Sequence, residues 1–164
     1  VVLARKLTSG LRHYVACTRT AKRDIVKIER KITNKGVTMG LDQYAFKIKK
    51  GIIKSPVFND KQVPQKELVE IAYWRKHPNL HGWMERLYDS KGGEGMFNCE
   101  FVHLTESDLT KLQDDILQQA LIEASGPFWG HDADEEYRKD DLAFIKEAFD
   151  SIDQGYDILY YSWW

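Results

Sequence analysis

Hydrophobic and polar residues alternate along two stretches of the chain, as they do in strands that bury one face. Over 43–49, the apolar residues Tyr44, Phe46 and Ile48 fall on one side of the expected strand, and the same period runs over 156–164. Two further runs are rich in aromatic and branched residues, which favour strands. We therefore expect strands over about 43–49, 68–75, 97–104 and 156–164.

Three other segments carry apolar residues at helical spacing, which indicates amphipathic helices. Pro78 suits the first turn of one helix, Thr105 begins a capping sequence for another, and Gly155 is placed to end the third. Residues 54–66 contain Pro56 and Pro64 and are expected to form a loop. The expected helices extend from Pro78 to about 91, over about 106–121, and from the acidic stretch 132–136 to about 154.

The order of these elements predicts the fold class. It is strand, strand, helix, strand, helix, helix, strand, with the strands spread along the chain rather than alternating regularly with helices. Such an order favours an α+β fold, in which a small and mostly antiparallel sheet of about four strands packs against about three helices. A chain of 164 residues is long enough for one core of this kind.

Charge divides the sequence into two parts. Residues 1–38 contain ten Lys and Arg against two acidic residues, a net charge of +8, whereas residues 39–164 contain 14 against 23, a net charge of −9. We predict a basic N-terminal extension over 1–38, helical over about 21–33 and not native to the domain, followed by a single domain over 39–164. The extension offers a surface for nucleic acid, whereas the acidic body disfavours it.

The sequence contains no run of roughly 18 apolar residues, the length that spans a bilayer, and no continuous apolar stretch typical of a secretory signal. We therefore expect no membrane association and a cytoplasmic location. Cys17 and Cys99 are far apart and form no CxxC motif, so the sequence predicts two reduced thiols.

Five motifs keep a characteristic order and spacing along the chain: Met39-Gly-Leu-Asp-Gln-Tyr-Ala45, the block Tyr73-Trp-Arg-Lys-His-Pro-Asn-Leu-His-Gly-Trp83, Phe97-Asn-Cys99, Ser125-Gly-Pro-Phe-Trp-Gly130 and the terminal Tyr161-Ser-Trp-Trp164. Together they resemble a family of short phage and bacterial proteins with no established function. That family has an MGLD-Y start, a YWRK-x4-H-x-W block, a GFFFG-like turn and a terminal SWW. The resemblance covers about 39–164 and implies a phage-type protein.

One part of that block carries the densest polar and aromatic cluster in the sequence. If the strand ends near Arg75 and the helix begins at Pro78, an anion could bind at the helix N-terminus beside Arg75, and His81 could act as acid or base with Glu70 to orient it. The alternative is structural: the indoles belong to the core, Arg75 pairs with a carboxylate, and His81 satisfies a backbone group. The candidate binding residues are Glu70, Tyr73, Trp74, Arg75, His77, His81 and Trp83.

Metal and cofactor chemistry has weaker support. His77 and His81 are four residues apart, as are Cys99 and His103. Pro78 lies between the two histidines, so one helical face need not carry both of them. Cys99 and His103 would lie on one face of a strand but too far apart along it to bind the same metal ion. We expect no metal and no cofactor. An acidic run is interpreted as a solvated helix start without the spacing of a calcium loop. It comprises Asp132, Asp134, Glu135, Glu136, Asp140 and Asp141.

No recognised catalytic motif is present, so a non-enzymatic role is the leading hypothesis. The excess of aromatic residues favours an accessory or regulatory domain that binds a protein partner. The alternative is a small enzyme or ligand-binding protein that holds a phosphorylated or nucleotide-like molecule at the Glu70, Arg75 and His81 corner. A concave pocket at this trio would favour the alternative, whereas exposed aromatic residues would favour partner binding.

Overall fold

The computed structural model describes residues 40–126, 128–130 and 134–164. They belong to one compact unit, Met39–Trp164. The predicted helix over 21–33 lies outside the described residues. Within the described part of the chain, no helix is long and apolar enough to cross a membrane.

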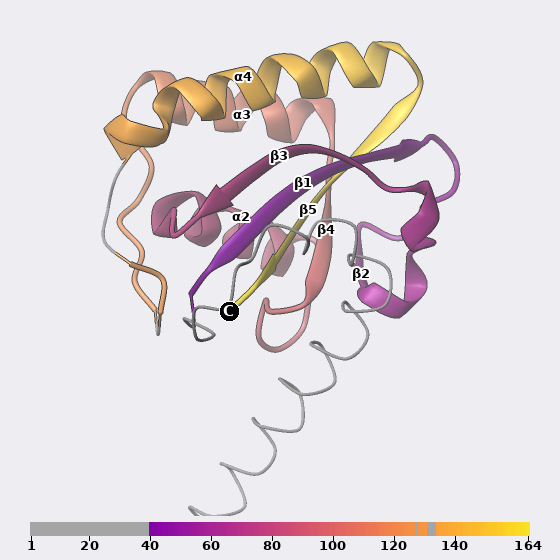
Figure 1. Cartoon of the computed structure of the whole chain (residues 1–164), viewed down its shortest axis with the longest axis horizontal. Helices are drawn as coiled ribbons and strands as arrows, with labels where there is room; N and C mark the ends of the chain where they lie inside the picture. Colours follow the sequence, from indigo (N-terminus) through magenta and orange to yellow (C-terminus); the bar gives the residue numbers. More distant parts are fainter. Residues whose placement is uncertain (1–39, 127, 131–133) are drawn as a thin grey trace, which may run out of the picture. The chain divides into compact units, whose positions relative to one another are not determined.

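Five strands form one sheet in the order β2-β4-β5-β1-β3, and every neighbouring pair is antiparallel (Figure 1). The first and the last of the described strands, β1 and β5, therefore lie side by side within the sheet. The strands are β1 (Asp42–Lys49), β2 (Val57–Asn59), β3 (Val69–Arg75), β4 (Glu100–Leu104) and β5 (Tyr156–Trp163).

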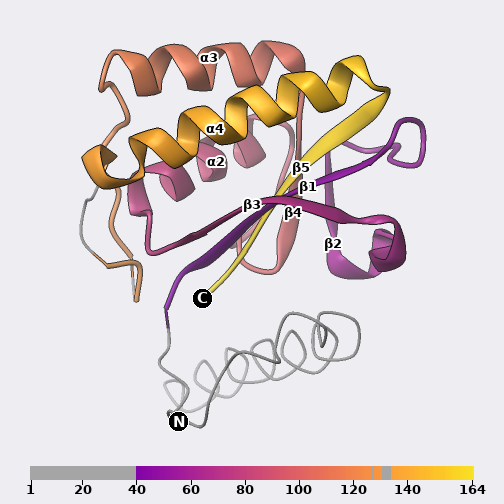
Figure 2. The ribbon, with the colours of Figure 1, turned by 45° about the horizontal axis from the view of Figure 1, so that its top comes forward.

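Three helices, α2 (Pro78–Ser90), α3 (Glu106–Leu117) and α4 (Asp134–Asp153), pack together on one face of the sheet (Figure 2). The predicted capping sequence forms, since the Thr105 side chain accepts from the Asp108 backbone N–H and the Asp108 carboxylate accepts from the Thr105 N–H. The predicted α+β class is thus confirmed, with one strand more than the four expected.

The differences from the sequence-based elements lie at boundaries and in one connection. The predicted loop over 54–66 contains β2 and two short 3-10 helices, η3 (Asp60–Gln62) and η4 (Gln65–Glu67). The strand expected from residue 97 begins at Glu100, and the helix expected to reach residue 121 ends at Leu117. The start of β4 coincides with its pairing, since Glu100 is opposite Asn59 of β2.

Each face of the sheet carries its own apolar cluster. On the helix side, the Trp74 ring packs edge-on against Phe144 of α4 with centroids 5.1 Å apart, and Tyr160 of β5 is fully buried. The opposite face holds a second cluster of mainly aromatic residues, to which the connection between β1 and β3 contributes Val63 and Leu68. Its buried aromatic members are Tyr44, Phe46, Phe58, Phe101 and Tyr161.

Candidate functional site

The corner between β3 and α2 is built around a buried histidine. Lys76 adopts a left-handed backbone conformation with φ 62°, and Pro78 then begins α2. This turn places His77 entirely out of solvent, with its Nε2 3.0 Å from the Asp141 carboxylate of α4. Trp74 donates its indole N–H to the other oxygen of Asp141 at 2.8 Å. One buried carboxylate therefore joins the end of β3, the start of α2 and the middle of α4.

Gln43 of β1 extends this polar network toward β5. Its side-chain oxygen accepts from the His77 backbone N–H at 2.9 Å, and its amide nitrogen donates to the His77 carbonyl and to the Tyr160 hydroxyl. The Tyr160 hydroxyl lies 3.2 Å from His81 Nδ1. Burial raises the pKa of Tyr160 and lowers the pKa of His81 to about 3, so both side chains are neutral at pH 7.

The remaining predicted residues of β3 lie on the other face of the sheet. Arg75 is opposite Asp42 in the β1 register and contacts its carboxylate at 3.2 Å, and Tyr73 donates its hydroxyl to the same oxygen at 2.6 Å. A register shift between Ala45 and Phe46 places Glu70 opposite Phe46, which belongs to the cluster on that face. Burial and the Asp42 charge raise the pKa of Tyr73, and burial raises that of Glu70.

The structure therefore separates the predicted trio. His81 faces the helix-side core, whereas Glu70 and Arg75 are on the opposite face, so these three groups do not converge on one ligand. Trp83 has a structural role: its indole N–H donates to Asp115 of α3 at 2.8 Å and ties two helices together. The residues that do converge are Trp74, His77 and His81, in a network completed by Gln43, Asp141 and Tyr160.

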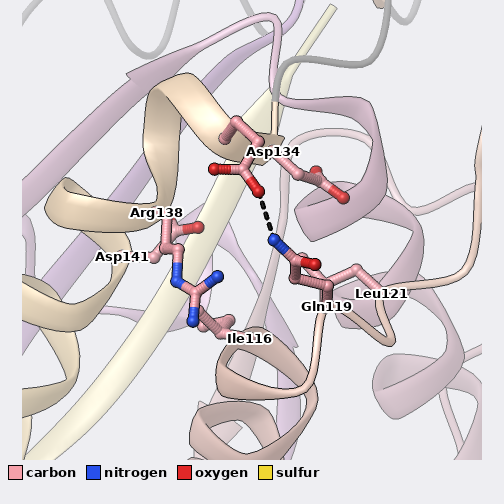
Figure 3. Close-up of a pocket in the computed structure, with 7 residues that line it drawn as sticks. Ile116, Gln119, Leu121, Asp134, Arg138 and Asp141 are labelled. Carbon is pink, nitrogen blue, oxygen red and sulfur yellow. Dashed lines mark hydrogen bonds between the residues drawn. The ribbon is translucent and has the colours of Figure 1, made fainter.

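Figure 3 shows a small pocket between the end of α3 and the start of α4. Gln119 donates to the Glu135 carboxylate across it, and Arg138 donates to the Leu117 carbonyl at 3.1 Å. Asp134 accepts from the Asn79 side-chain amide at 3.0 Å, so these polar groups of the pocket are hydrogen-bonded within the protein. We assign it no ligand. Its lining residues are Ile116, Gln119, Leu121, Asp134, Glu135, Arg138 and Asp141.

Asp141 corrects the interpretation of the acidic run as a solvated helix start. It is 1% exposed, because it lies on the same side of α4 as the buried Ile145 and Ala148, four and seven positions further on. That spacing was a signal in the sequence. Asp132 lies outside the described residues, whereas Asp140, Glu135 and Glu136 are exposed as predicted.

The metal hypothesis gains no support from geometry. No group of three or more His, Cys, Asp and Glu side chains that could hold a metal occurs within the part of the chain that the structure describes. His103, which the sequence paired with Cys99, lies 3.5 Å from the Asp157 carboxylate. Cys99 is disulfide-bonded, so the prediction of a reduced thiol is wrong for this residue; Cys17 lies outside the described residues.

Comparisons with protein-family models, with curated proteins and with solved structures give no match for this chain. The resemblance to phage and bacterial proteins therefore stays a hypothesis, and function has to be argued from the geometry.

Proposed function

We propose that this chain is a non-enzymatic accessory domain that binds a protein partner, and that the partner adds a strand along the outer edge of β3. The supporting observation is the sheet order. β3 is seven residues long and stands at one end of the sheet, and no described strand pairs with its outer side. Val69 is 50% exposed and Tyr73 47% exposed, so apolar and aromatic surface accompanies this edge.

The hydrogen-bond pattern indicates which backbone groups face outward. The Lys76 N–H donates to the Leu41 carbonyl at 2.8 Å, which places these two residues at a hydrogen-bonded position of the ladder, although the Leu41 N–H donates to the Phe128 carbonyl. Pairs alternate along an antiparallel ladder, so the next hydrogen-bonded pair is Trp74 with Gln43, and the pair Tyr73 with Tyr44 is not hydrogen-bonded. The N–H and C=O of Tyr73 therefore point away from β1, where an added strand would meet them.

Neighbouring features limit the proposed docking edge to Val69–Tyr73. At one end, the Tyr137 hydroxyl of α4 donates to the Arg75 carbonyl, which covers that part of β3. The opposite edge of the sheet is β2, which has only three residues. A strand of five residues is of ordinary length, whereas three offer few ladder bonds. The β3 edge is thus the better site for strand addition.

The Tyr73 side chain suits an interface anchor. Its hydroxyl is fixed by Asp42 and its ring lies 5.1 Å from the Tyr44 ring, yet almost half of its surface is exposed. An ordered tyrosine adds contact area at little cost in conformational entropy, and tyrosine is enriched among residues that dominate binding energy.

Site-specific photo-crosslinking in cells that express the full chain tests this proposal. A photoreactive residue at Val69 should give a discrete adduct with one partner. The same residue at Ile122, which is 62% exposed but lies outside the sheet, is the matched control. Identical adducts from both positions, or no adduct from Val69, would contradict the docking edge.

A proline variant distinguishes strand addition from side-chain contact alone. Tyr73→Pro removes an outward N–H without breaking the β1 ladder, whereas Tyr73→Ala removes only the side chain. With the identified partner, Tyr73→Pro should weaken binding clearly more than Tyr73→Ala does, and the Tyr73 amide of the unmodified chain should gain protection from hydrogen exchange. Equal effects of the two substitutions would argue against strand addition.

A further inference from the structure

A cluster of aromatic rings surrounds His81 at the end of the sheet where β5 finishes, away from the β3 edge. The His81 ring stacks on Phe97 at 5.6 Å with an interplanar angle of 3°, and it meets the Trp129 ring edge-on at 4.5 Å. Trp129 in turn meets Trp164 edge-on at 5.7 Å. Residues from α2, the segment before β4, the segment before α4 and the C-terminal end of β5 thus form one contiguous cluster.

The two indoles of this cluster are held firmly in place. Asn98 donates to the Trp164 carbonyl at 3.0 Å and accepts from the Trp164 N–H at 3.1 Å, which fixes the end of β5. The Trp129 ring lies against Gly126 so closely that a Cβ there would come within 2.4 Å of Trp129 Cε2. The Trp164 backbone and the Trp129 ring are therefore positioned by the fold.

Three buried nitrogen atoms in this cluster have no hydrogen-bond partner among the described residues: His81 Nε2, Trp129 Nε1 and Trp164 Nε1. His81 is fully buried and Trp129 is 5% exposed. Folded proteins pair the great majority of their buried polar groups, and an unpaired one points to an unseen water or ligand. Three in neighbouring rings indicate a common cause.

Two of the three nitrogen atoms are donors by their chemistry, and we assign the third as a donor as well. An indole nitrogen can only donate. We assign the tautomer of His81 from its contact with Tyr160: the Tyr160 hydroxyl accepts from the Gln43 amide, and we place its own hydrogen on the bond to His81 Nδ1. Since burial keeps His81 neutral, its remaining nitrogen, Nε2, carries the hydrogen.

We propose that the cluster of His81, Trp129 and Trp164 is a binding site for a small carboxylate, whose oxygens accept hydrogen bonds from the three N–H groups. A site of donors alone matches a ligand of acceptors alone. A carboxylate has two such oxygens and no donor, whereas an amide or an alcohol would bring a hydrogen that needs its own acceptor. Hydrogen bonds to a charged oxygen are also stronger than those to a neutral one.

Nuclear magnetic resonance of the ¹⁵N-labelled full chain tests the proposal, with sodium formate as the probe and sodium chloride at equal ionic strength as the reference. The indole N–H signals of Trp129 and Trp164 should shift downfield and saturate. Those of Trp74 and Trp83, which already donate to Asp141 and Asp115, should stay in place. They serve as internal controls within the same sample.

A pair of conservative variants locates the site. Trp129→Phe keeps an aromatic ring but removes one donor, and should weaken formate binding by about ten-fold or more, as expected for one hydrogen bond to a charged group. Trp83→Phe removes an indole N–H that bonds elsewhere and should leave formate binding unchanged. Far-ultraviolet circular dichroism of both variants confirms that each is folded before the comparison is made.

Several results would overturn the proposal. One is the absence of any saturable shift with formate at Trp129 and Trp164, which would mean that ordered water alone satisfies these donors. Another is an equal response to chloride, which would show a general salt effect. Saturation by acetone but not by formate would replace the carboxylate with a neutral carbonyl and overturn the anionic assignment.

Discussion

Trp74 and Arg75 are neighbours in the sequence, yet they lie in contrasting environments. Trp74 is fully buried on the helix side and donates to a buried carboxylate, whereas Arg75 contacts its carboxylate on the opposite face with 42% of its side chain exposed. Both residues belong to the motif that suggested a single site. Side chains alternate along a strand, so a compact motif in sequence can be divided between two faces in space.

The same contrast sets what each region can do. On the helix side, Asp141 bonds to Trp74 and His77 inside a packed core, which favours a fixed structural network. On the outer edge of β3, backbone groups and an exposed tyrosine face solvent, which favours recognition. Substitutions in the two regions should therefore differ in their effect on stability.

The largest effect is expected at Asp141. Asp141→Ala removes the acceptor of both His77 Nε2 and the Trp74 indole, leaving two buried donors unpaired. The free energy of unfolding should fall by about 2–6 kcal/mol, because each buried donor left unpaired costs about 1–3 kcal/mol. Urea unfolding followed by circular dichroism measures this loss.

Two variants control for the position on α4. Asp140→Ala changes the exposed neighbouring residue and should alter stability by less than about 0.5 kcal/mol. Asp141→Asn keeps one acceptor and should be less destabilising than Asp141→Ala. Equal stability of the Asp140 and Asp141 alanine variants would show that the helix-side network contributes no more than surface charge.

An intermediate effect is expected from pH. Burial holds the pKa of His81 at about 3 in the folded chain, well below its usual 6.5. Between these values the unfolded state binds a proton that the folded state does not, so stability decreases as the pH falls below about 6.5. From pH 7 to pH 5 the contribution of His81 should decrease by about 2 kcal/mol, since each full pH unit below 6.5 changes it by about 1.4 kcal/mol.

His81→Phe separates this contribution from those of other groups, because it retains an aromatic ring but cannot titrate. The difference in unfolding free energy between the unmodified chain and the variant, measured by urea at pH 7 and pH 5, should change by the stated amount. Burial also lowers the pKa of His103, but that contribution is present in both proteins and cancels. A difference that is independent of pH would show that His81 is accessible to protons.

Much of the fold could be predicted because its signals are local. Period-two alternation located β1 and β5, and the capping sequence at Thr105 located the start of α3. β2 was missed because three residues carry too little pattern, and its pairing with β4 is determined by residues more than forty positions away. Long-range pairing of this kind leaves no trace in a short window of sequence.

The candidate site was predicted less well, for two physical reasons. His77 and Asp141 are 64 positions apart, so only the tertiary structure reveals their contact. Trp74 faces the helices, and simple alternation would place Glu70, four residues earlier, on the same face; the register shift between β1 and β3 moves Glu70 to the other face. What the sequence did locate correctly was the corner itself, where the chain turns from β3 into α2.

The smallest effect is expected for the ion pair between Arg75 and Asp42, and a double-mutant cycle sharpens the comparison with the buried network. Single substitutions mix several contacts, whereas the cycle of Arg75→Leu and Asp42→Asn isolates the coupling of this pair. Solvent screens the exposed guanidinium, so the coupling should be below about 1 kcal/mol and should decrease further in 1 M NaCl.

The parallel cycle of Trp74→Phe and Asp141→Asn, measured by the same urea titrations, should keep its coupling in high salt because solvent ions do not reach that pair. Should the Arg75 and Asp42 coupling exceed about 2 kcal/mol and resist salt, the outer face would be as rigidly organised as the helix side, and the contrast drawn between them would be wrong.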